Sequence, residues 1–465
     1  MLFFKDHDIS ERLNLPRLFL ACVPMILMMI SISVYSVVDG FFVSNFAGKT
    51  QFASVNLIYP FIMVIGSLGF MMGTGGTALV AKRMGEGKIE EAKKLFFNCF
   101  VVTIALGVSF SLGSVFFLPQ IAKGLGADEA MLPYCVDYGR ILILGITFFN
   151  LQNMFQPFFA ASGKPGLGFA ITIGAGVANI IFDAIFVAGC GWGCVGAAWG
   201  TVIGQIVGGL LPAIYYFAKN KSALRMTPGK MQWGAIARMA TNGFSEFVSQ
   251  IAVSALSMIM NVLLMKHYQE NGVSAYGIIC YVWLIFAATF IGLCMGISPR
   301  ISYTYGEKNK AELQRLTQRA LQLFLIAGLF EFIFAEALTV PLSYAYAGYD
   351  EGLRQLTCHA SFIYSIIYLA LGINMFGSAF FTALNNGVVS AILSFARFML
   401  FEAVSVYLCS LFWQGDGIWW GVVIGETLGF VMNFLVILFC GKRYGYNLLR
   451  WEKDEKKTPD SLGGQ

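Results

Sequence analysis

The segment GAAWGTVIGQIVG at residues 196–208 recurs 221 positions later in the chain as GIWWGVVIGETLG at residues 417–429. Seven of the thirteen aligned positions are identical. The same offset aligns GEGKIEEAKKL at residues 85–95 with GEKNKAELQRL at residues 306–316. Matched blocks in the same order indicate an internal duplication, because unrelated segments do not keep one fixed spacing. The sequence therefore predicts two homologous halves with the same fold.

The composition predicts that both halves lie in a membrane. Hydrophobic residues make up 57% of the chain and charged residues only 12%, against about 25% charged residues in a typical soluble domain. A bilayer span needs about 20 apolar residues, because a helix that rises about 1.5 Å per residue must cross about 30 Å of hydrocarbon. Segments of suitable length that contain no charge lie at residues 18–38, 51–81, 95–122, 166–182, 195–218 and 272–299. Further apolar runs carry one or two charges each, so the sequence predicts an all-α membrane protein with about twelve transmembrane helices.

Residues 1–222 and 223–465 are expected to form two six-helix bundles, the second followed by a cytoplasmic tail. Because each half has an even number of spans, both halves enter and leave the membrane on the same side, and the axis that relates them runs along the membrane normal. In transporters of this build the substrate path lies between the halves, and alternating access comes from rocking one half against the other. The alternative is a duplicated membrane scaffold without transport activity.

The basic residues orient the chain in the membrane. With the N-terminus in the cytoplasm, 25 of the 31 Lys and Arg residues fall on the inner side and 4 on the outer side. This asymmetry follows the positive-inside rule and predicts that both termini are cytoplasmic. The net charge of +5 therefore reflects orientation, and no basic domain with interleaved aromatic residues suggests a nucleic-acid partner.

The expected spans take up most of the chain and leave little sequence for a soluble domain. The polar stretches between the expected spans are too short for a soluble domain, so we expect neither an enzyme nor a bound cofactor. The ten cysteines lie mostly inside spans and show no zinc-like spacing. Cys190 and Cys194 share a short outer loop in which a disulfide is chemically permitted, although two free thiols are the preferred interpretation. Nothing in the sequence requires an oligomer, so we expect a monomer surrounded by lipid.

Asp39 and Asp183 form the main candidate site. An ionisable group inside a span is costly when it faces lipid, so it should line the protein interior or a wet cavity. Both acids should lie in the outer half of the membrane at similar depth, and Asn179 lies one helical turn before Asp183 on the same helix face. Burial and a neighbouring carboxyl favour proton uptake at such a pair. A Na⁺ ion would instead need several oxygens, which Asp39, Asp183, Asn179 and Thr201 can supply; the alternative for Asp39 alone is an interfacial acid at a helix end.

Further charges are expected inside the spans of the second half. We predict that Arg397 and Glu402, five residues apart, form a buried structural pair, because a partner offsets the cost of desolvation. Glu426 stands where the first repeat has the neutral Gln205. Glu246, early in the seventh span, is a second candidate for cation coupling.

The sequence also resembles the bacterial branch of the multidrug and toxic compound extrusion (MATE) family along almost its whole length. The resemblance rests on VYSVVDGFFVSNFAG in the first span, the GEG and GEK turns of the repeat, FFAASGKP before the fifth span and NIIFD within it. It implies the MATE fold, with two pseudo-symmetric six-helix bundles around a central cavity. It further implies a multi-pass protein of the bacterial cytoplasmic membrane that exports small organic, often cationic, drugs by H⁺ or Na⁺ antiport.

The resemblance also assigns residues to two groups. The coupling site would comprise Asp39, Asp183, Asn179 and Thr201. The substrate cavity would be lined by Tyr35, Asn153, Gln156 and Glu246, although Gln156 stands where the family pattern has an asparagine.

Two other functions remain open from the sequence. A flippase for lipid-linked saccharides, from a related superfamily, would need several buried Arg or Lys side chains for the pyrophosphate, whereas only Arg140 and Arg397 fall within spans. A receptor or channel without coupling would show no concentrative transport. The sequence does not decide between H⁺ and Na⁺.

Overall fold

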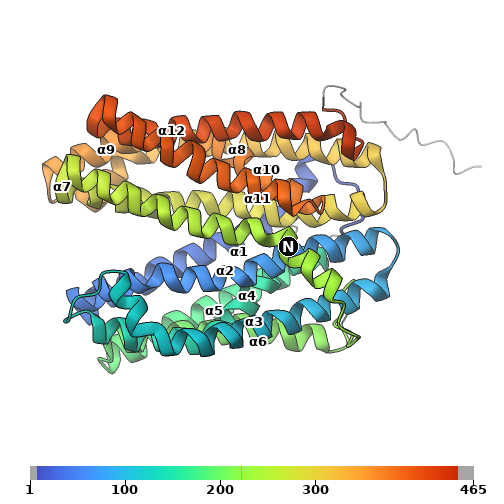
Figure 1. The fold of residues 1–465 in the computed structure, drawn as a ribbon, viewed down its shortest axis with the longest axis horizontal. Coiled ribbons are helices and arrows are strands. Elements are labelled where there is room, and N and C mark those ends of the chain that lie inside the picture. Colours follow the sequence, from blue (N-terminus) through green and yellow to red (C-terminus); the bar gives the residue numbers. More distant parts are fainter. Residues whose placement is uncertain (1–7, 221, 449–465) are drawn as a thin grey trace, which may run out of the picture.

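The computed structural model describes residues 8–220 and 222–448, which form helices joined by short connections, without a strand in these ranges. Figure 1 labels the helices in chain order. Their bounds are α1 Leu15–Phe42, α2 Lys49–Gly85, α3 Ile89–Gly124, α4 Leu132–Ala161, α5 Pro165–Asp183, α6 Gly193–Phe217, α7 Trp233–Gly306, α8 Lys310–Ala347, α9 Glu351–Ser365, α10 Tyr368–Ala383, α11 Gly387–Phe395 and α12 Ala403–Tyr444. Three short π-helical segments follow α1, α5 and α11: η2 Val43–Ala47, η3 Ala184–Gly189 and η4 Ala396–Glu402.

The predicted number of membrane spans is confirmed once the reversals inside two long helices are counted. Within the described ranges, nine helices are long and apolar enough to cross a membrane, and α9 with α10 makes a tenth span bent by 51°. Helix α7 has 74 residues, far more than the roughly 20 that one crossing needs. Its backbone reverses at Gln269, where φ is 54°, so that the hydroxyls of Ser257 and Tyr276 lie 3.5 Å apart. The run from α11 through α12 reverses in the same way at Gln414, which brings the described part of the chain to twelve spans.

The helices form two lobes, each with its own hydrophobic core. One core draws on residues from Ile9 to Met239, and the other mainly on residues from Ala252 to Tyr446. In Figure 1 the helices α3–α6 lie in the lower lobe and α8–α12 in the upper lobe. The linker between α6 and α7 connects the lobes, and the expected domain boundary at residue 222 falls within it. The placement of that boundary stays a prediction.

Close backbone contact joins the lobes where α2 crosses α7. A Cβ atom at Gly75 would collide with the Met239 carbonyl oxygen, and one at Gly85 would collide with the Tyr303 carbonyl oxygen. Only glycine permits so close an approach of two helix backbones. The Asn385 amide also donates to the Ala78 carbonyl oxygen across the lobes at 3.3 Å.

The N-terminal arm reinforces this contact at the same end of the molecule. The Arg300 Nη1 atom donates to the carbonyl oxygens of Asp8 at 3.0 Å and Glu11 at 3.2 Å. The Arg319 Nη1 atom donates to the Leu13 carbonyl oxygen at 2.6 Å. The lobes are therefore joined at the end that carries the basic α2–α3 and α7–α8 connections, which the sequence predicts to be cytoplasmic.

Candidate functional site

A cavity of about 640 Å³ lies between the lobes, and residues from both lobes line it. The first lobe contributes side chains from α1, α2, α4, α5 and α6, and the second contributes side chains from α7, α10, α11 and η4. Cavities of this size suit small organic molecules, since ligand pockets in proteins commonly span about 300–1,000 Å³. The cavity is therefore the candidate substrate site.

Asp39 and Asp183 come together at the wall of this cavity, as the sequence predicts. Asp39 lines the cavity from α1, and its carboxyl contacts the side chains of Asp183 and Asn179. The Thr201 hydroxyl lies 3.5 Å from the Asp39 Oδ1 atom. Asp183 is fully buried and does not line the cavity itself, and its carboxyl lies against the side chains of Asp39 and Asn179. The four expected coupling residues thus form one cluster, which does not support the interpretation of Asp39 as a lone acid at a helix end.

The repeated glycine segment explains how the second acid reaches this position. A Cβ atom at Gly200 of α6 would collide with the Asp183 carboxyl, and one at Gly204 would lie 2.9 Å from the Ala175 carbonyl oxygen of α5. The glycines at every fourth position let α5 and α6 pack closely along one face. The same segment therefore serves packing and places the carboxyl of Asp183 beside α6.

A π-helical segment follows each of the two acids, Asp39 and Asp183, within about one helical turn. Asp183 is the last residue of α5 before η3, and Asp39 lies four residues before η2. A π-helical segment shifts the direction of side chains and is frequent at functional sites. Sequence reasoning gave no sign of these segments, because an ordinary helical period was assumed throughout each span.

The expected cavity residues also line the cavity, although they do so from two lobes. Tyr35, Asn153 and Gln156 lie on the first-lobe wall. Asn153 donates to the Gly66 carbonyl oxygen at 3.2 Å, whereas the Gln156 Oε1 atom accepts no hydrogen bond from the described residues. Glu246 lines the cavity from α7, and its carboxylate has no hydrogen bond or ion pair in the described ranges. It is an acid on the second-lobe wall without a partner of opposite charge.

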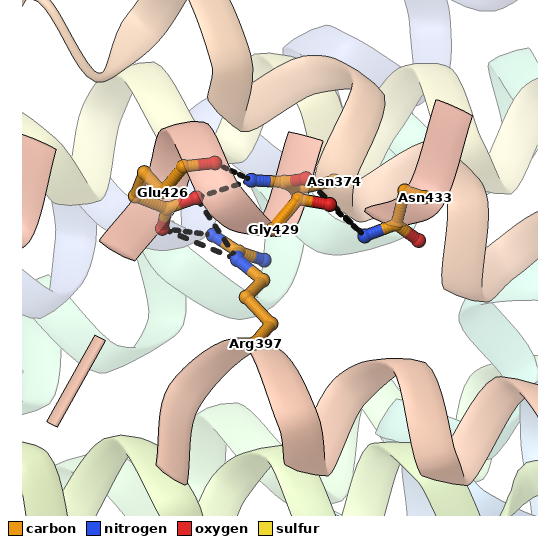
Figure 2. A network of polar contacts seen from close by, with 5 residues as sticks. All are labelled: Asn374, Arg397, Glu426, Gly429 and Asn433. Carbon is orange, nitrogen blue, oxygen red and sulfur yellow. Dashed lines mark hydrogen bonds and ion pairs between the residues drawn. The ribbon is translucent and has the colours of Figure 1, made fainter. Parts of the chain in front are cut away.

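The predicted pair of Arg397 and Glu402 is wrong, because Arg397 pairs with Glu426 instead. The Arg397 Nη2 atom lies 2.6 Å from Glu426 Oε1, and Arg397 Nε lies 3.2 Å and 3.1 Å from the two carboxylate oxygens (Figure 2). The two residues are 5% and 3% exposed. Glu426 lies on the neighbouring helix α12, where its carboxylate contacts the Arg397 guanidinium group directly, whereas no hydrogen bond or ion pair joins Arg397 to Glu402 within η4.

Two asparagines complete this network and were missed from the sequence. The Asn374 amide donates to the Glu426 Oε2 atom at 2.5 Å, and the Asn433 amide donates to the Asn374 Oδ1 atom at 3.2 Å (Figure 2). The repeat offset of 221 maps Asn153 onto Asn374 and would have indicated the first of them. Arg397 and Asn374 also line the cavity.

Other polar residues singled out in the sequence lie away from the site. Arg140 is exposed on α4, so it is not one of the buried cations that a flippase would need. Cys190 and Cys194 are both free thiols, which agrees with the preferred interpretation. Among residues 8–220 and 222–448, no group of three or more His, Cys, Asp or Glu side chains is arranged to hold a metal ion. A cation at Asp39 and Asp183 would therefore draw on hydroxyl or amide oxygens for its remaining ligands.

A family model described as MatE matches residues 24–185 and, a second time, residues 247–408. Each half of the chain thus matches the same model once, in accord with the internal duplication. Among curated proteins, the chain is 24% identical over 432 residues to the "Multidrug export protein MepA" of Staphylococcus saprophyticus, covering 90% of this chain and 93% of that protein. It is 23% identical over 431 residues to the protein of the same name from Staphylococcus aureus, with 90% and 93% coverage.

Solved structures show the same fold. "Crystal structure of MATE in complex with MaL6" superposes with a TM-score of 0.88 at 21% identity, covering 93% of this chain and 98% of that one. A second structure is described as the "Outward-facing conformation of a multidrug resistance MATE family transporter of the MOP superfamily". It has a TM-score of 0.87 at 21% identity and covers 94% and 97% of the two chains. The two-lobed arrangement predicted from the duplication is confirmed by these neighbours.

Proposed function

The chain belongs to the MatE family, and we propose that it exports small organic compounds across the bacterial cytoplasmic membrane in exchange for an inward-moving H⁺ or Na⁺ ion. The observation that carries this proposal is the contact between Asp39 and Asp183 at the wall of a cavity between two lobes. The relatives named as multidrug export proteins support the direction and the class of cargo. Both termini are assigned to the cytoplasm by the distribution of basic residues.

The acidic pair supplies a chemical basis for exchange. Two carboxyl groups in contact repel each other when both are ionised, so a proton or small cation bound at the pair stabilises it. The bound ion also removes negative charge from the cavity wall. A cationic compound is then held less firmly, because the Coulomb attraction that retained it has weakened. Ion binding from outside therefore favours release of the cargo to the outside.

The two lobes supply the movement that exchange requires. They are in backbone contact at the predicted cytoplasmic end, where Gly75 and Gly85 meet α7. Rocking of one lobe against the other would open this end and close the opposite one. Described residues of one chain line the cavity from both lobes, so we infer that the protein works as a monomer.

The cavity lining favours aromatic organic cations as cargo. Aromatic side chains from both lobes face the cavity, namely Phe52, Tyr59, Phe70, Phe149, Tyr281, Trp283 and Phe398. Aromatic faces attract flat cations through cation–π and stacking contacts. Arg397 adds little repulsion, because Glu426 neutralises its charge.

Replacing Glu246 by Gln should weaken export of cationic dyes several-fold while export of a neutral substrate of similar size changes little. The half-buried carboxyl lines the cavity without a partner of opposite charge, so it is available to attract a cation bound there. Competition transport assays with both substrate types would measure the change in apparent affinity. The matched control is Glu336→Gln on α8, an acid that does not line the cavity. Equal losses for charged and neutral cargo would contradict a charge-specific role.

Transport assays in reconstituted vesicles identify the coupling ion. The purified protein is reconstituted into vesicles, and dye movement is followed under an imposed pH difference, an imposed Na⁺ difference, or neither. We expect concentrative dye movement under one of the two gradients and none without a gradient. Dye movement that only equalises concentrations under every condition would contradict antiport and indicate a channel.

The flippase alternative receives less support from the cavity. Arg397 is the lining residue with a permanent positive charge, and both oxygens of Glu426 already contact its guanidinium group. A pyrophosphate would have to displace this buried carboxylate from its partner. Binding would therefore leave a buried Glu426 without compensation, which is costly.

A further inference from the structure

The second lobe contains a polar cluster at the position that corresponds to the acidic site of the first lobe. Glu402 packs against Gly425 in the second lobe, as Asn179 packs against Gly204 in the first, and the two glycines are 221 residues apart. The same offset places Glu426 opposite Gln205. The duplication has therefore given both lobes polar groups at equivalent places, but with different charges.

Within this second cluster, one of the two acids is fully partnered. Both oxygens of Glu426 contact the Arg397 guanidinium group, and the Asn374 amide donates a further hydrogen bond (Figure 2). A guanidinium group stays charged in proteins, because its pKa exceeds about 12. Arg397 and Glu426 therefore form a neutral unit without help from other residues.

The other acid, Glu402, is buried and shares the single nearby cation, Arg397, with Glu426. It is 4% exposed, and its Oε2 atom accepts no hydrogen bond from the described residues. A Cβ atom at Gly425 would collide with the Glu402 backbone, so the acid is held directly beside Glu426 on α12. If every group in the cluster were ionised, one negative charge would remain uncompensated in the interior.

The other ionisable neighbours of Glu402 cannot compensate that charge. They are Tyr276 on α7 and Tyr364 on α9, buried phenols that carry no positive charge in either protonation state. The Tyr276 hydroxyl lies within reach of Ser257, another neutral group. Apart from Arg397, the described residues around Glu402 include no cation that interacts with it.

We propose that Glu402 is a second proton-binding site of this protein, located in the C-terminal lobe and exchanged during the transport cycle. A proton fits this place better than a metal ion, because a metal ion needs several free oxygens and those of Glu426 and Asn374 are already bonded. Binding converts the Glu402 carboxylate to a neutral acid and lowers the negative charge of the cluster by one. Arg397 and Asn374 line the cavity, so protonation of Glu402 changes the electrostatic potential at the cavity wall.

The inference rests on the proposed antiport for its functional meaning, but proton binding itself is measured separately. Infrared spectra of the purified full-length protein, recorded over a pH series, report the C=O stretching band of protonated carboxyl groups. We expect Glu402→Gln to lose one pH-dependent component of this band. The double variant Asp39→Asn, Asp183→Asn should keep that component and lose others. A Glu402→Gln spectrum identical to that of the unaltered protein would overturn the proposal.

The same spectra separate an exchangeable proton from a permanent one. A Glu402 component that is present at every pH and unaffected by dye binding would overturn exchange. In vesicles, Glu402→Gln should still export dye, with fewer protons moved per dye molecule than in the unaltered protein. A failure of the proposed antiport gives a different result. Dye transport would then depend on neither the pH difference nor the Na⁺ difference, while the Glu402 component remained in the infrared spectra.

Folding of neutral variants provides a further check. A site that holds a neutral acid tolerates other neutral side chains, so Glu402→Gln and Glu402→Met should both elute as monodisperse protein and melt near the temperature of the unaltered chain. Loss of folding in both variants would overturn the proposal, since it would show that Glu402 is needed as an anion.

Discussion

Replacing Asp39 or Asp183 by Asn is expected to reduce dye efflux to the level of cells that lack the protein. Each carboxyl contacts the other at the cavity wall, so a proton or cation bound at the pair depends on both. An amide of the same shape keeps the packing but cannot take up a proton in the required range. Efflux of a fluorescent cationic dye from intact cells measures the effect, and the protein amount in the membrane is measured alongside.

The matched control for these variants is Asp137→Asn, the same chemical change at an exposed acid of α4 in the same lobe. This control should export dye at the normal rate. Normal efflux in both Asp39→Asn and Asp183→Asn would remove the basis for the coupling site. Loss in one of them alone would reassign coupling to a single carboxyl.

The Glu426→Gln variant is expected to be markedly less stable than the unaltered chain. It replaces the one carboxylate in direct contact with Arg397 by an amide, and Arg397 cannot neutralise itself by losing its proton. Breaking a buried ion pair from one side typically costs about 3–5 kcal/mol. Thermal unfolding of the purified protein, followed by dye binding or by size-exclusion elution after heating, measures the loss.

Two further variants show whether the cost arises from the unpaired charge. The double variant Arg397→Met, Glu426→Met removes both charges and should recover most of the lost stability, because apolar replacements of buried pairs are often neutral. Combining Glu426→Gln with Glu402→Gln should cost more than Glu426→Gln alone, since Glu402 is then no longer available to ionise beside Arg397. A Glu426→Gln protein that melts like the unaltered chain would show that the pair contributes nothing to stability.

Much of the candidate site follows from the sequence, because depth along a helix depends only on residue count. Asp39 is the 25th residue of α1 and Asp183 the 19th of α5, so a fixed rise per residue places both toward the C-terminal ends of their helices, which the sequence predicts to lie in the outer half of the membrane. Their chemical type then predicts a shared ion site. The partner of Arg397 could not be found in this way, because it depends on the rotation of η4 and on which face of α12 packs against it.

The sequence alone determined the all-helical membrane fold, the number of spans, the duplication and the acidic residues of the first lobe. These features are local, since hydropathy, repeat spacing and helical rise can be read along one chain. The tertiary structure alone decided that Arg397 binds Glu426, that the Oε2 atom of Glu402 accepts no hydrogen bond from the described residues, and that the lobes meet at the end near Gly85 and Gly306. These facts depend on contacts between helices far apart in the chain, where small rotations change which side chains meet.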